Sequence, residues 1–207
     1  LLFSLFNLDF FFIKRGVCTC CSKRTFFYST DSWLRDNFYC KICGSIPRER
    51  ALMHVIESNY PDWKDLYIHE SSPEQRGASI KLKNYCRNYI SSQYYNDAEP
   101  GKLINGHYNE NLENQSFDNE SFDIVISQDV MEHVLNPEKA FGEIARTLKP
   151  GGAHIFTVPL VNKHKPSEKW AELDSEGKLV FLNEPEYHGN PIDPQGSRSE
   201  DSRLKSN

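Results

Sequence analysis

The sequence predicts an α/β protein with a parallel sheet, preceded by a small cysteine-rich module. Residues 122–127 are a short apolar, β-branched run bounded by polar residues, which is typical of a buried parallel strand. A helical pattern follows, and a second β-rich run covers residues 153–158. Strand, helix and strand in this order form a βαβ unit, which places parallel strands in one sheet. The cysteine-rich module is indicated by five of the six cysteines, which fall within residues 18–43.

The helix of this βαβ unit has well-marked ends. Asn136 is a candidate N-cap, and Pro137 occupies the first helical position, where a missing N–H costs little. Lys149 stands in the predicted last turn, and the Pro-Gly-Gly triplet at 150–152 is expected to end the helix. An apolar stripe at helical spacing is predicted to face the sheet: Phe141, Ile144, Ala145 and Leu148.

The remaining elements are predicted from weaker patterns. The expected order after the cysteines is a helix from the Gly44 region to about Asn59, a strand over 66–70, a helix over 77–88, a strand over 88–95 and a strand over 102–108. The last eleven residues, 197–207, are charged and Ser-rich without a strand pattern, so we expect them to be disordered.

Four cysteines have the spacing of a zinc site. Cys18 and Cys21 form one Cys-x-x-Cys pair, and Cys40 and Cys43 form another, eighteen residues later. Two such turns bring four thiolates onto one tetrahedral ion, and the intervening segment is predicted to form a hairpin. If Cys20 served as a ligand in place of Cys18 or Cys21, the spacing of the ligands would be less usual. Disulfides or free thiols are the alternatives, although disulfides need an oxidising compartment that the rest of the chain does not indicate. With four protein ligands, this zinc would be structural.

Charge and hydropathy exclude some classes of protein. The 207-residue chain has a formal net charge of −5, which argues against a general nucleic-acid binder but leaves a local basic patch possible. Residues 1–16 are unusually apolar, but the run before Lys14 is too short to span a bilayer and lacks the features of a signal peptide. We expect a strand-like extension there, with a trimmed signal or anchor as the alternative. A cytoplasmic protein without a membrane partner is therefore expected.

The βαβ stretch also resembles a known family. It reads FDIVISQDVMEHVLNPEKAFGEIARTLKPGGAHIFTVP. This sequence resembles the fourth strand, following helix and fifth strand of class I S-adenosylmethionine-dependent methyltransferases. The resemblance implies a Rossmann-like, doubly wound and mostly parallel sheet; another doubly wound α/β domain is the alternative. Five segments within about residues 18–196 resemble a subgroup of this family that has an N-terminal cysteine ribbon. They are CKICGSIPRERALMHVIE, IHESSPEQRGAS, SQDVMEHV, VPLVNKHKPSE and EYHGNP.

The resemblance implies S-adenosylmethionine as cofactor and a set of residues to hold it. The family has a Gly-x-Gly loop after the first strand, whereas this chain has SSPEQRG, so the binding role passes to Glu70, Ser71 and Ser72. Gln93 stands near the acid that normally accepts the ribose hydroxyls. The other implied contacts lie after later strands, with a loop-capping role as the alternative for the first of them: Asn111, Leu112, Gln128 and Asp129.

The acceptor side is implied less sharply. Methyl transfer to a hydroxyl needs a base, and His133, His164 and His188 are the candidates, with a histidine satisfied by local backbone bonds as the alternative for His133. The acceptor is expected to be a small molecule or glycan, methylated on oxygen. A non-catalytic zinc-ribbon module that binds a partner is the rival hypothesis, because the glycine loop and the second-strand acid are missing.

These predictions divide the chain into five parts, with the C-terminal strands of the family expected to be missing and a sheet edge left exposed. The parts are an apolar extension over 1–16, the zinc-ribbon-like module over 17–46, the methyltransferase core over 47–161, an acceptor-side segment over 162–196 and a disordered tail over 197–207.

Overall fold

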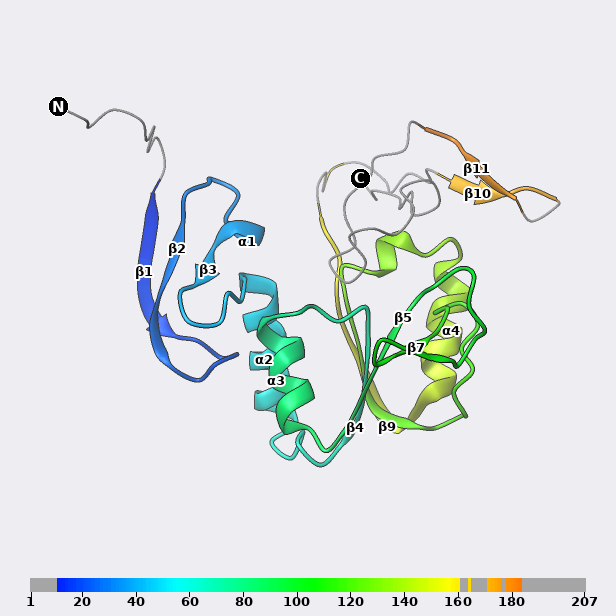
Figure 1. The fold of residues 1–207 in the computed structure, drawn as a ribbon, viewed down its shortest axis with the longest axis horizontal. Coiled ribbons are helices and arrows are strands. Elements are labelled where there is room, and N and C mark those ends of the chain that lie inside the picture. The colour runs from blue at the N-terminus through cyan, green and yellow to red at the C-terminus, as the bar shows by residue number, and fades with distance from the viewer. Residues whose placement is uncertain (1–10, 161–163, 165–170, 176–177, 184–207) are drawn as a thin grey trace. The chain divides into compact units, whose positions relative to one another are not determined.

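The computed structural model describes residues 11–160, 164, 171–175 and 178–183. The chain divides into two compact units. One, the ribbon unit, consists of Leu1–Trp63 and Glu74–Tyr85; the other, the sheet unit, consists of Lys64–Pro73 and Cys86–Asn207. Figure 1 shows the elements of both units along the chain.

The ribbon unit begins with a three-stranded antiparallel sheet in the order β1-β2-β3. Its elements are β1 (Phe12–Val17), β2 (Arg24–Ser29), the short helix α1 (Leu34–Asn37) and β3 (Tyr39–Cys40). Side chains alternate along β2, with Thr25, Phe27 and Ser29 buried and the residues between them exposed. The segment between the two cysteine pairs folds back on itself as predicted, because β2 pairs with β3.

Two helices complete the ribbon unit, α2 (Pro47–Asn59) and α3 (Gly77–Tyr85). The predicted end of α2 at Asn59 is confirmed, and its buried face includes Leu52, Met53 and Ile56. The Glu49 carboxylate accepts the Ile46 N–H at 3.1 Å, which satisfies one of the free donors at the start of the helix. The helix predicted over 77–88 ends earlier, since Asn88 already belongs to the next strand.

The sheet unit contains a six-stranded sheet in the order β6-β7-β5-β4-β8-β9. All neighbouring strands are parallel except β6 and β7, so the predicted mostly parallel α/β sheet is confirmed. The strands are β4 (Tyr67–Ser71), β5 (Asn88–Gln93), β6 (Leu103–Ile104), β7 (His107–Asn109), β8 (Phe122–Gln128) and β9 (Leu148–Thr157).

The prediction of one strand over 102–108 is wrong, because a hairpin occupies these residues. Asn105 and Gly106 have φ values of 50° and 84°, and they reverse the chain between β6 and β7. An Asn-Gly pair with two positive φ angles is the preferred two-residue hairpin turn, since Asn and Gly tolerate this conformation best. The Asn-Gly dipeptide was the signal that the apolar pattern obscured.

The predicted helix of the βαβ unit is α4 (Pro137–Thr147). The Asn136 side chain accepts the Lys139 N–H at 3.0 Å, which confirms the predicted cap. The predicted apolar stripe is wrong at Phe141 and Ala145, which are exposed. The buried face is instead Ala140, Ile144 and Thr147.

The predicted helix stop is also placed differently. The helix ends at Thr147, and β9 begins at once with Leu148, so Lys149 and the Pro-Gly-Gly triplet lie within the strand. The register slips there from Phe122↔Leu148 to Ile124↔Ala153, which makes the triplet a bulge rather than a turn. A side chain at Gly152 would lie 2.9 Å from the Lys149 carbonyl oxygen, so the bulge needs glycine there.

The apolar core of the sheet unit lies between β8 and α4. Ile124, Val125 and Ile126 are fully buried in β8, as expected for a strand covered on both faces. The cluster that includes α4 consists of Leu112, Phe122, Val125, Met131, Ala140 and Ile144. Met131 belongs to a 3₁₀ turn, η1 (Met131–His133), directly after β8.

A separate antiparallel pair follows β9, formed by β10 (Ala171–Leu173) and β11 (Leu179–Phe181). No strand is predicted there, because three-residue strands are too short to show a period of two. Within the described ranges, β9 pairs only with β8 and therefore forms an edge of the large sheet. None of the helices described is long and apolar enough to cross a membrane. Residues 197–207 lie outside the described residues.

Candidate cofactor site and four-cysteine cluster

Three central strands end side by side at the carboxyl edge of the sheet. Ser71 of β4 is in register with Ser92 of β5 and with Ser127 of β8. The next residue of each chain segment is therefore at the same level: Ser72, Gln93 and Gln128. Ligands of open α/β sheets bind at this edge, so the sheet itself brings together predicted residues that lie far apart in the sequence.

Glu70 is the buried carboxylate of this edge. It is 1% exposed and accepts two hydrogen bonds, from the Tyr89 hydroxyl at 2.8 Å and from Gln128 Nε2 at 3.3 Å. Burial and the neighbouring Glu70 charge raise the pKa of Tyr89, so the phenol keeps its proton and remains a donor. Tyr89 is a residue that the sequence patterns do not single out.

Two amide oxygens at this edge are buried without a hydrogen-bond partner in the described part of the chain. They are Oε1 of Gln93, which is 1% exposed, and Oε1 of Gln128, which is 7% exposed. A buried acceptor that lacks a donor costs roughly 1–3 kcal/mol. A ligand that brings hydroxyl or ammonium donors would remove this cost.

The loop after β4 takes a conformation that glycine usually provides. Ser72 has φ 52°, and its N–H donates to the Ser92 carbonyl at 2.8 Å. Ser71 is buried and Ser72 is half-buried. The loop thus makes its sharp turn with a serine, and this turn is tied to β5.

Asp129 makes the corresponding turn after β8. Its φ is 51°, and its N–H donates to the Thr157 carbonyl at 3.0 Å. The Thr157 hydroxyl donates to Asp129 Oδ1 at 2.9 Å. This carboxylate therefore joins the ends of β8 and β9.

Two of the implied cofactor contacts, Asn111 and Leu112, have local structural roles. Asn111 is exposed, and its Oδ1 accepts the Glu113 N–H at 2.9 Å, which is the loop-capping alternative. Leu112 is buried in the core cluster. Asn109, which was not predicted, organises the neighbouring loop, since it accepts the Tyr95 N–H and donates to the Ala98 carbonyl, both at 2.7 Å.

The three predicted histidine bases lie on different segments. His133 is half-buried in η1, directly after β8. His164 is exposed in a turn, and His188 lies outside the described residues. His133 is thus the candidate base that follows the cofactor-site strand most closely in the chain.

Two other histidines of the sheet, the buried His69 and the half-buried His154, have lowered pKa values. His69 is fully buried, and its Nε2 lies 2.8 Å from the Ser92 hydroxyl; burial lowers the pKa of His69 to about 3. His154 Nε2 lies 2.9 Å from the Ser127 hydroxyl, and burial lowers its pKa to about 4. Both rings are therefore neutral near pH 7 and serve as hydrogen-bonded packing groups.

The four predicted metal ligands converge in the ribbon unit. The Sγ atoms of Cys18, Cys21, Cys40 and Cys43 all lie within 4.8 Å of one another. Two separations are 3.7 Å, between Cys18 and Cys43, and 3.9 Å, between Cys21 and Cys40. A tetrahedral zinc with Zn–S bonds of about 2.3 Å places sulfurs about 3.8 Å apart. A disulfide would need about 2.05 Å, so the geometry fits a metal and not a bridge.

The surroundings of the cluster shift the pKa values of its cysteines in opposite directions. The Ser45 hydroxyl lies 3.2 Å from Cys18 Sγ and 3.3 Å from Cys43 Sγ. A hydrogen bond from Cys20 lowers the pKa of Cys18 to about 3, whereas burial raises the pKa of Cys43 to about 12. Cys20 is thus a buried neighbour of the cluster. A dication at the centre would favour the thiolate form of all four ligands.

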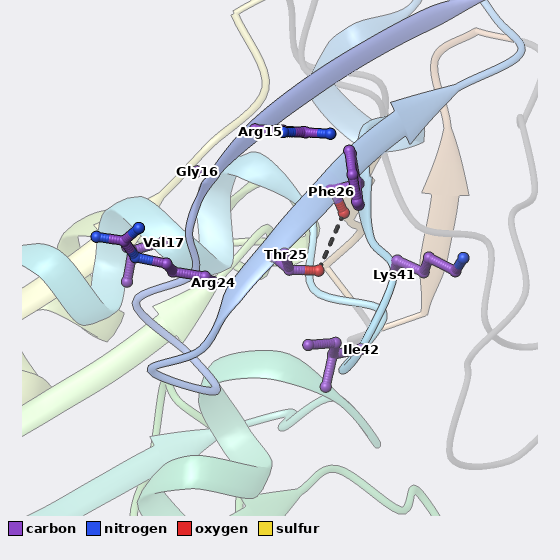
Figure 2. A pocket seen from close by; sticks show the side chains of 8 residues that line it. All are labelled: Arg15, Gly16, Val17, Arg24, Thr25, Phe26, Lys41 and Ile42. Atoms are coloured by element: carbon purple, nitrogen blue, oxygen red, sulfur yellow. Dashed lines mark hydrogen bonds between the residues drawn. The ribbon is translucent and has the colours of Figure 1, made fainter.

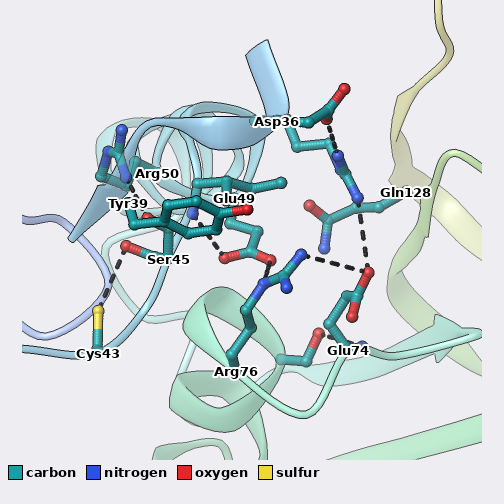
Figure 3. A network of polar contacts seen from close by, with 12 residues as sticks. Asp36, Tyr39, Cys43, Ser45, Glu49, Arg50, Glu74, Arg76 and Gln128 are labelled. Atoms are coloured by element: carbon teal, nitrogen blue, oxygen red, sulfur yellow. Dashed lines mark hydrogen bonds and ion pairs between the residues drawn. The ribbon is translucent and has the colours of Figure 1, made fainter. Parts of the chain in front are cut away.

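A network of ion pairs links α2 to the residues just before α3 (Figure 3). Glu49 is completely buried, and its carboxylate binds Arg76 Nε at 2.9 Å. Arg76 and Arg48 both contact the Glu74 carboxylate, at 3.7 Å and 3.5 Å. Gly77 has φ 55°, and a Cβ there would lie 2.0 Å from Glu49 Oε2. The second half of the SSPEQRG loop is therefore fixed by a buried ion pair.

Comparison with known proteins finds similarity to methyltransferases. A family model described as a methyltransferase domain matches residues 81–156. This segment is similar to a methyltransferase domain. A curated relative, sarcosine/dimethylglycine N-methyltransferase of Aphanothece halophytica, is 32% identical over 112 residues. The match covers 51% of this chain and 39% of the relative, so the chain spans about two-fifths of that protein. Both comparisons thus relate a part of this chain to methyltransferases.

Solved structures of similar fold are more distant. An S-adenosylmethionine-dependent methyltransferase from Mesorhizobium loti is 17% identical with a TM-score of 0.42, and the match covers 63% of each chain. The YcgJ protein of Bacillus subtilis is 16% identical with a TM-score of 0.41, over 51% of this chain and 49% of that one. The fold assignment here depends on the strand order of the sheet itself.

Proposed function

We propose that this chain is an S-adenosylmethionine-dependent methyltransferase whose cofactor binds at the carboxyl edge of β4, β5 and β8. The observation that carries the proposal is the pair of unpartnered amide oxygens, Gln93 Oε1 and Gln128 Oε1, on either side of the buried Glu70. Three acceptors gathered at one edge call for a ligand rich in donors. The family match over residues 81–156 supports the same cofactor.

The chemistry of the edge fits the donors of this cofactor. The ribose hydroxyls can donate to Gln93, and the ammonium group can donate to Glu70 and Gln128. Glu70 keeps the charge-assisted bond that Gln93, as a neutral amide, cannot offer. The cofactor supplies an electrophilic sulfonium methyl group; the protein needs to bind it, exclude water and align an acceptor.

The missing glycine loop is compatible with this proposal. Ser72 adopts the positive φ that glycine would provide, and the Glu49–Arg76 ion pair holds the residues before Gly77. In this chain, the serine turn and the Glu49–Arg76 ion pair fix the loop, whereas the family's loop obtains its conformation from glycine.

The acceptor is proposed to be a small molecule or a glycan. A hydroxyl acceptor needs a base, and the proposal gives this role to His133, which is half-buried in the turn after β8. The curated relative is named an N-methyltransferase, so an amine acceptor is the alternative. An amine with a free lone pair needs less help from a base, so His133→Ala would impair O-methylation more than N-methylation.

The cysteine cluster is proposed to bind one structural zinc ion. Cys18, Cys21, Cys40 and Cys43 supply all four ligands, which leaves no open position for substrate or water. Metal analysis of the purified chain should give one zinc per chain. A thiol-modifying reagent should release this zinc from a chain that contains no disulfide. Disulfides present before the reagent is added would indicate oxidised cysteines instead.

Calorimetric titration with S-adenosylmethionine and S-adenosylhomocysteine tests the proposed function. We expect both ligands to bind, and Glu70→Gln to weaken both. Gln115→Leu is the matched control, because within the described residues Gln115 is also a buried amide whose side chain has no hydrogen-bond partner, but it precedes β8 instead of following it. Absence of heat at millimolar ligand would contradict the proposal and favour a non-catalytic module that binds a partner.

A further inference from the structure

The sheet of the ribbon unit has an open face that the proposed methyl transfer does not use. Arg24, Phe26 and Tyr28 are the exposed residues of β2. The antiparallel register places Val17, Arg15 and Ile13 of β1 beside them on the same face. Tyr39 of β3 lies opposite Tyr28, with their ring centroids 6.1 Å apart. The open face thus carries aromatic rings interleaved with cations.

A hollow of about 700 Å³ lies on this face (Figure 2). Its walls include Arg15, Val17, Arg24, Phe26, Lys41 and Ile42, and no Asp or Glu is among the described residues that line it. Figure 2 shows Thr25 and Phe26 on β2, Arg15 on the neighbouring strand β1, and Lys41 and Ile42 on the neighbouring loop. The Arg15 guanidinium carbon is 4.9 Å from the centre of the Phe26 ring. The hollow therefore combines a ring with three positive charges.

The three cations are available for an external anion. In the described part of the chain, no ion pair engages Arg15, Arg24 or Lys41. Residues 11–46 hold six Lys or Arg and two Asp, although the whole chain has a net charge of −5. One of the two, Asp36, already pairs with Arg35 and Arg48. Positive charge is thus concentrated in residues 11–46. The net negative charge of the whole chain conceals this local excess.

We propose that the open face of the ribbon unit binds single-stranded nucleic acid. Cations hold the phosphates, and exposed rings such as Phe26 and Tyr28, each 38% exposed, provide faces on which bases stack. Arg15 above Phe26 adds a cation to the same platform. Extended single strands fit such a surface because their bases are free to stack, whereas bases in a duplex are already stacked and paired.

The shape of the surface favours a strand over a lipid surface. Membrane-binding faces insert protruding apolar side chains into the bilayer. Here the apolar side chains of Val17 and Ile42 line a hollow together with Phe26. A hollow of this size can receive part of an extended strand, but it is not a surface that inserts into a bilayer.

Fluorescence anisotropy of the zinc-loaded full chain with a labelled mixed-sequence single strand of about 12 nucleotides tests the proposal. Binding is expected at low salt, and log K should fall with log salt with a slope of about −2 for three phosphate contacts. Phe26→Ala should weaken binding about five- to 100-fold at constant salt. Arg24→Gln and Lys41→Gln should each weaken binding and make the slope shallower by about 0.7.

Lys14→Gln is the matched control. Lys14 belongs to the same strand as Arg15 and is exposed, but it is paired with Phe27 and so lies on the opposite face. Zinc content and melting temperature of every variant show that the ribbon unit remains folded. No binding at low salt, equal losses in Lys14→Gln and Arg24→Gln, or binding to anionic vesicles without binding to the oligonucleotide would each overturn the proposal.

Discussion

The ribbon unit and the sheet unit are stabilised in different ways. The ribbon unit buries polar groups at its centre: Ser45, a fully buried Glu49, and Lys81, whose ammonium binds the Thr19 carbonyl and Glu57, each at 2.6 Å. The sheet unit is organised around β8, where Ile124, Val125 and Ile126 are fully buried. A small module lacks the apolar area to fold well alone, so metal and ion pairs carry more of its stability.

The largest expected difference between the units concerns zinc. Cys40→Ser, or removal of zinc by a chelator, should unfold the ribbon unit, because structural zinc sites contribute roughly 10–16 kcal/mol to folding. Emission of Trp63, which is 3% exposed, should shift to the red as the unit opens. Cys86→Ser is the control, since this buried cysteine of the sheet unit donates to the Leu66 carbonyl and is no metal ligand. Unchanged Trp63 emission after zinc removal would contradict the distinction.

The ion pairs of the two units should differ next. Arg76→Ala leaves Glu49 as an uncompensated buried charge, and we expect a loss of about 3–5 kcal/mol in the free energy of unfolding. Arg87→Ala removes an ion pair with Asp65 in the sheet unit, but both side chains are exposed, so the loss should be about 0–1 kcal/mol. Urea denaturation measures both. Equal losses would show that burial does not decide the strength of these pairs.

Acid should weaken the sheet unit through its buried histidines. The pKa of His69 is lowered to about 3, so between pH 6.5 and 3 the unfolded chain binds a proton that the folded chain does not. Stability therefore falls as pH falls through this window, by about 1.4 kcal/mol per pH unit for His69 at its steepest. His69→Leu should reduce this slope while His154 maintains a part of it. An unchanged slope in His69→Leu, or the same reduction in the exposed His54→Leu, would be inconsistent with this account.

The smallest effects concern two glycines of the sheet unit. Gly106→Ala should destabilise by about 1 kcal/mol, because φ is 84° in the β6–β7 turn. Gly142→Ala should stabilise by about 0.5–1 kcal/mol, because this glycine lies in α4 with open space around it. Thermal unfolding of the two variants should therefore shift in opposite directions. Shifts of the same sign would mean that backbone conformation does not control either position.

Much of the fold was predictable because local chemistry and tertiary structure agree. The runs at β8 and β9, the Asn136 cap and the two Cys-x-x-Cys pairs are local signals that long-range packing does not override. The stripe of α4 was predicted one residue out of place, because Ala140 and Thr147 are weak apolar signals beside Phe141. The bulge at Pro150-Gly-Gly depends on the approach of the Asp123 carbonyl, which no local pattern contains.

The candidate site was predictable only in part. Glu70, Gln93 and Gln128 were implied by the family resemblance, and each stands at the carboxyl end of a parallel strand. Tyr89 was missed because its contact with Glu70 joins two neighbouring strands, and a tyrosine inside a strand resembles any packing residue. The Glu49–Arg76 pair was missed for the same reason, since twenty-seven residues separate its members.

Hydrogen exchange of the zinc-loaded chain, with and without S-adenosylhomocysteine, tests the central claim most directly. The account predicts slower exchange in peptides that contain Ser71 and Ser72, Gln93, or Gln128 and Asp129. Peptides from the open face of the ribbon unit, around Phe26, should not change. Protection confined to the ribbon unit, or none at saturating ligand, would contradict the claim that the carboxyl edge of β4, β5 and β8 is the cofactor site.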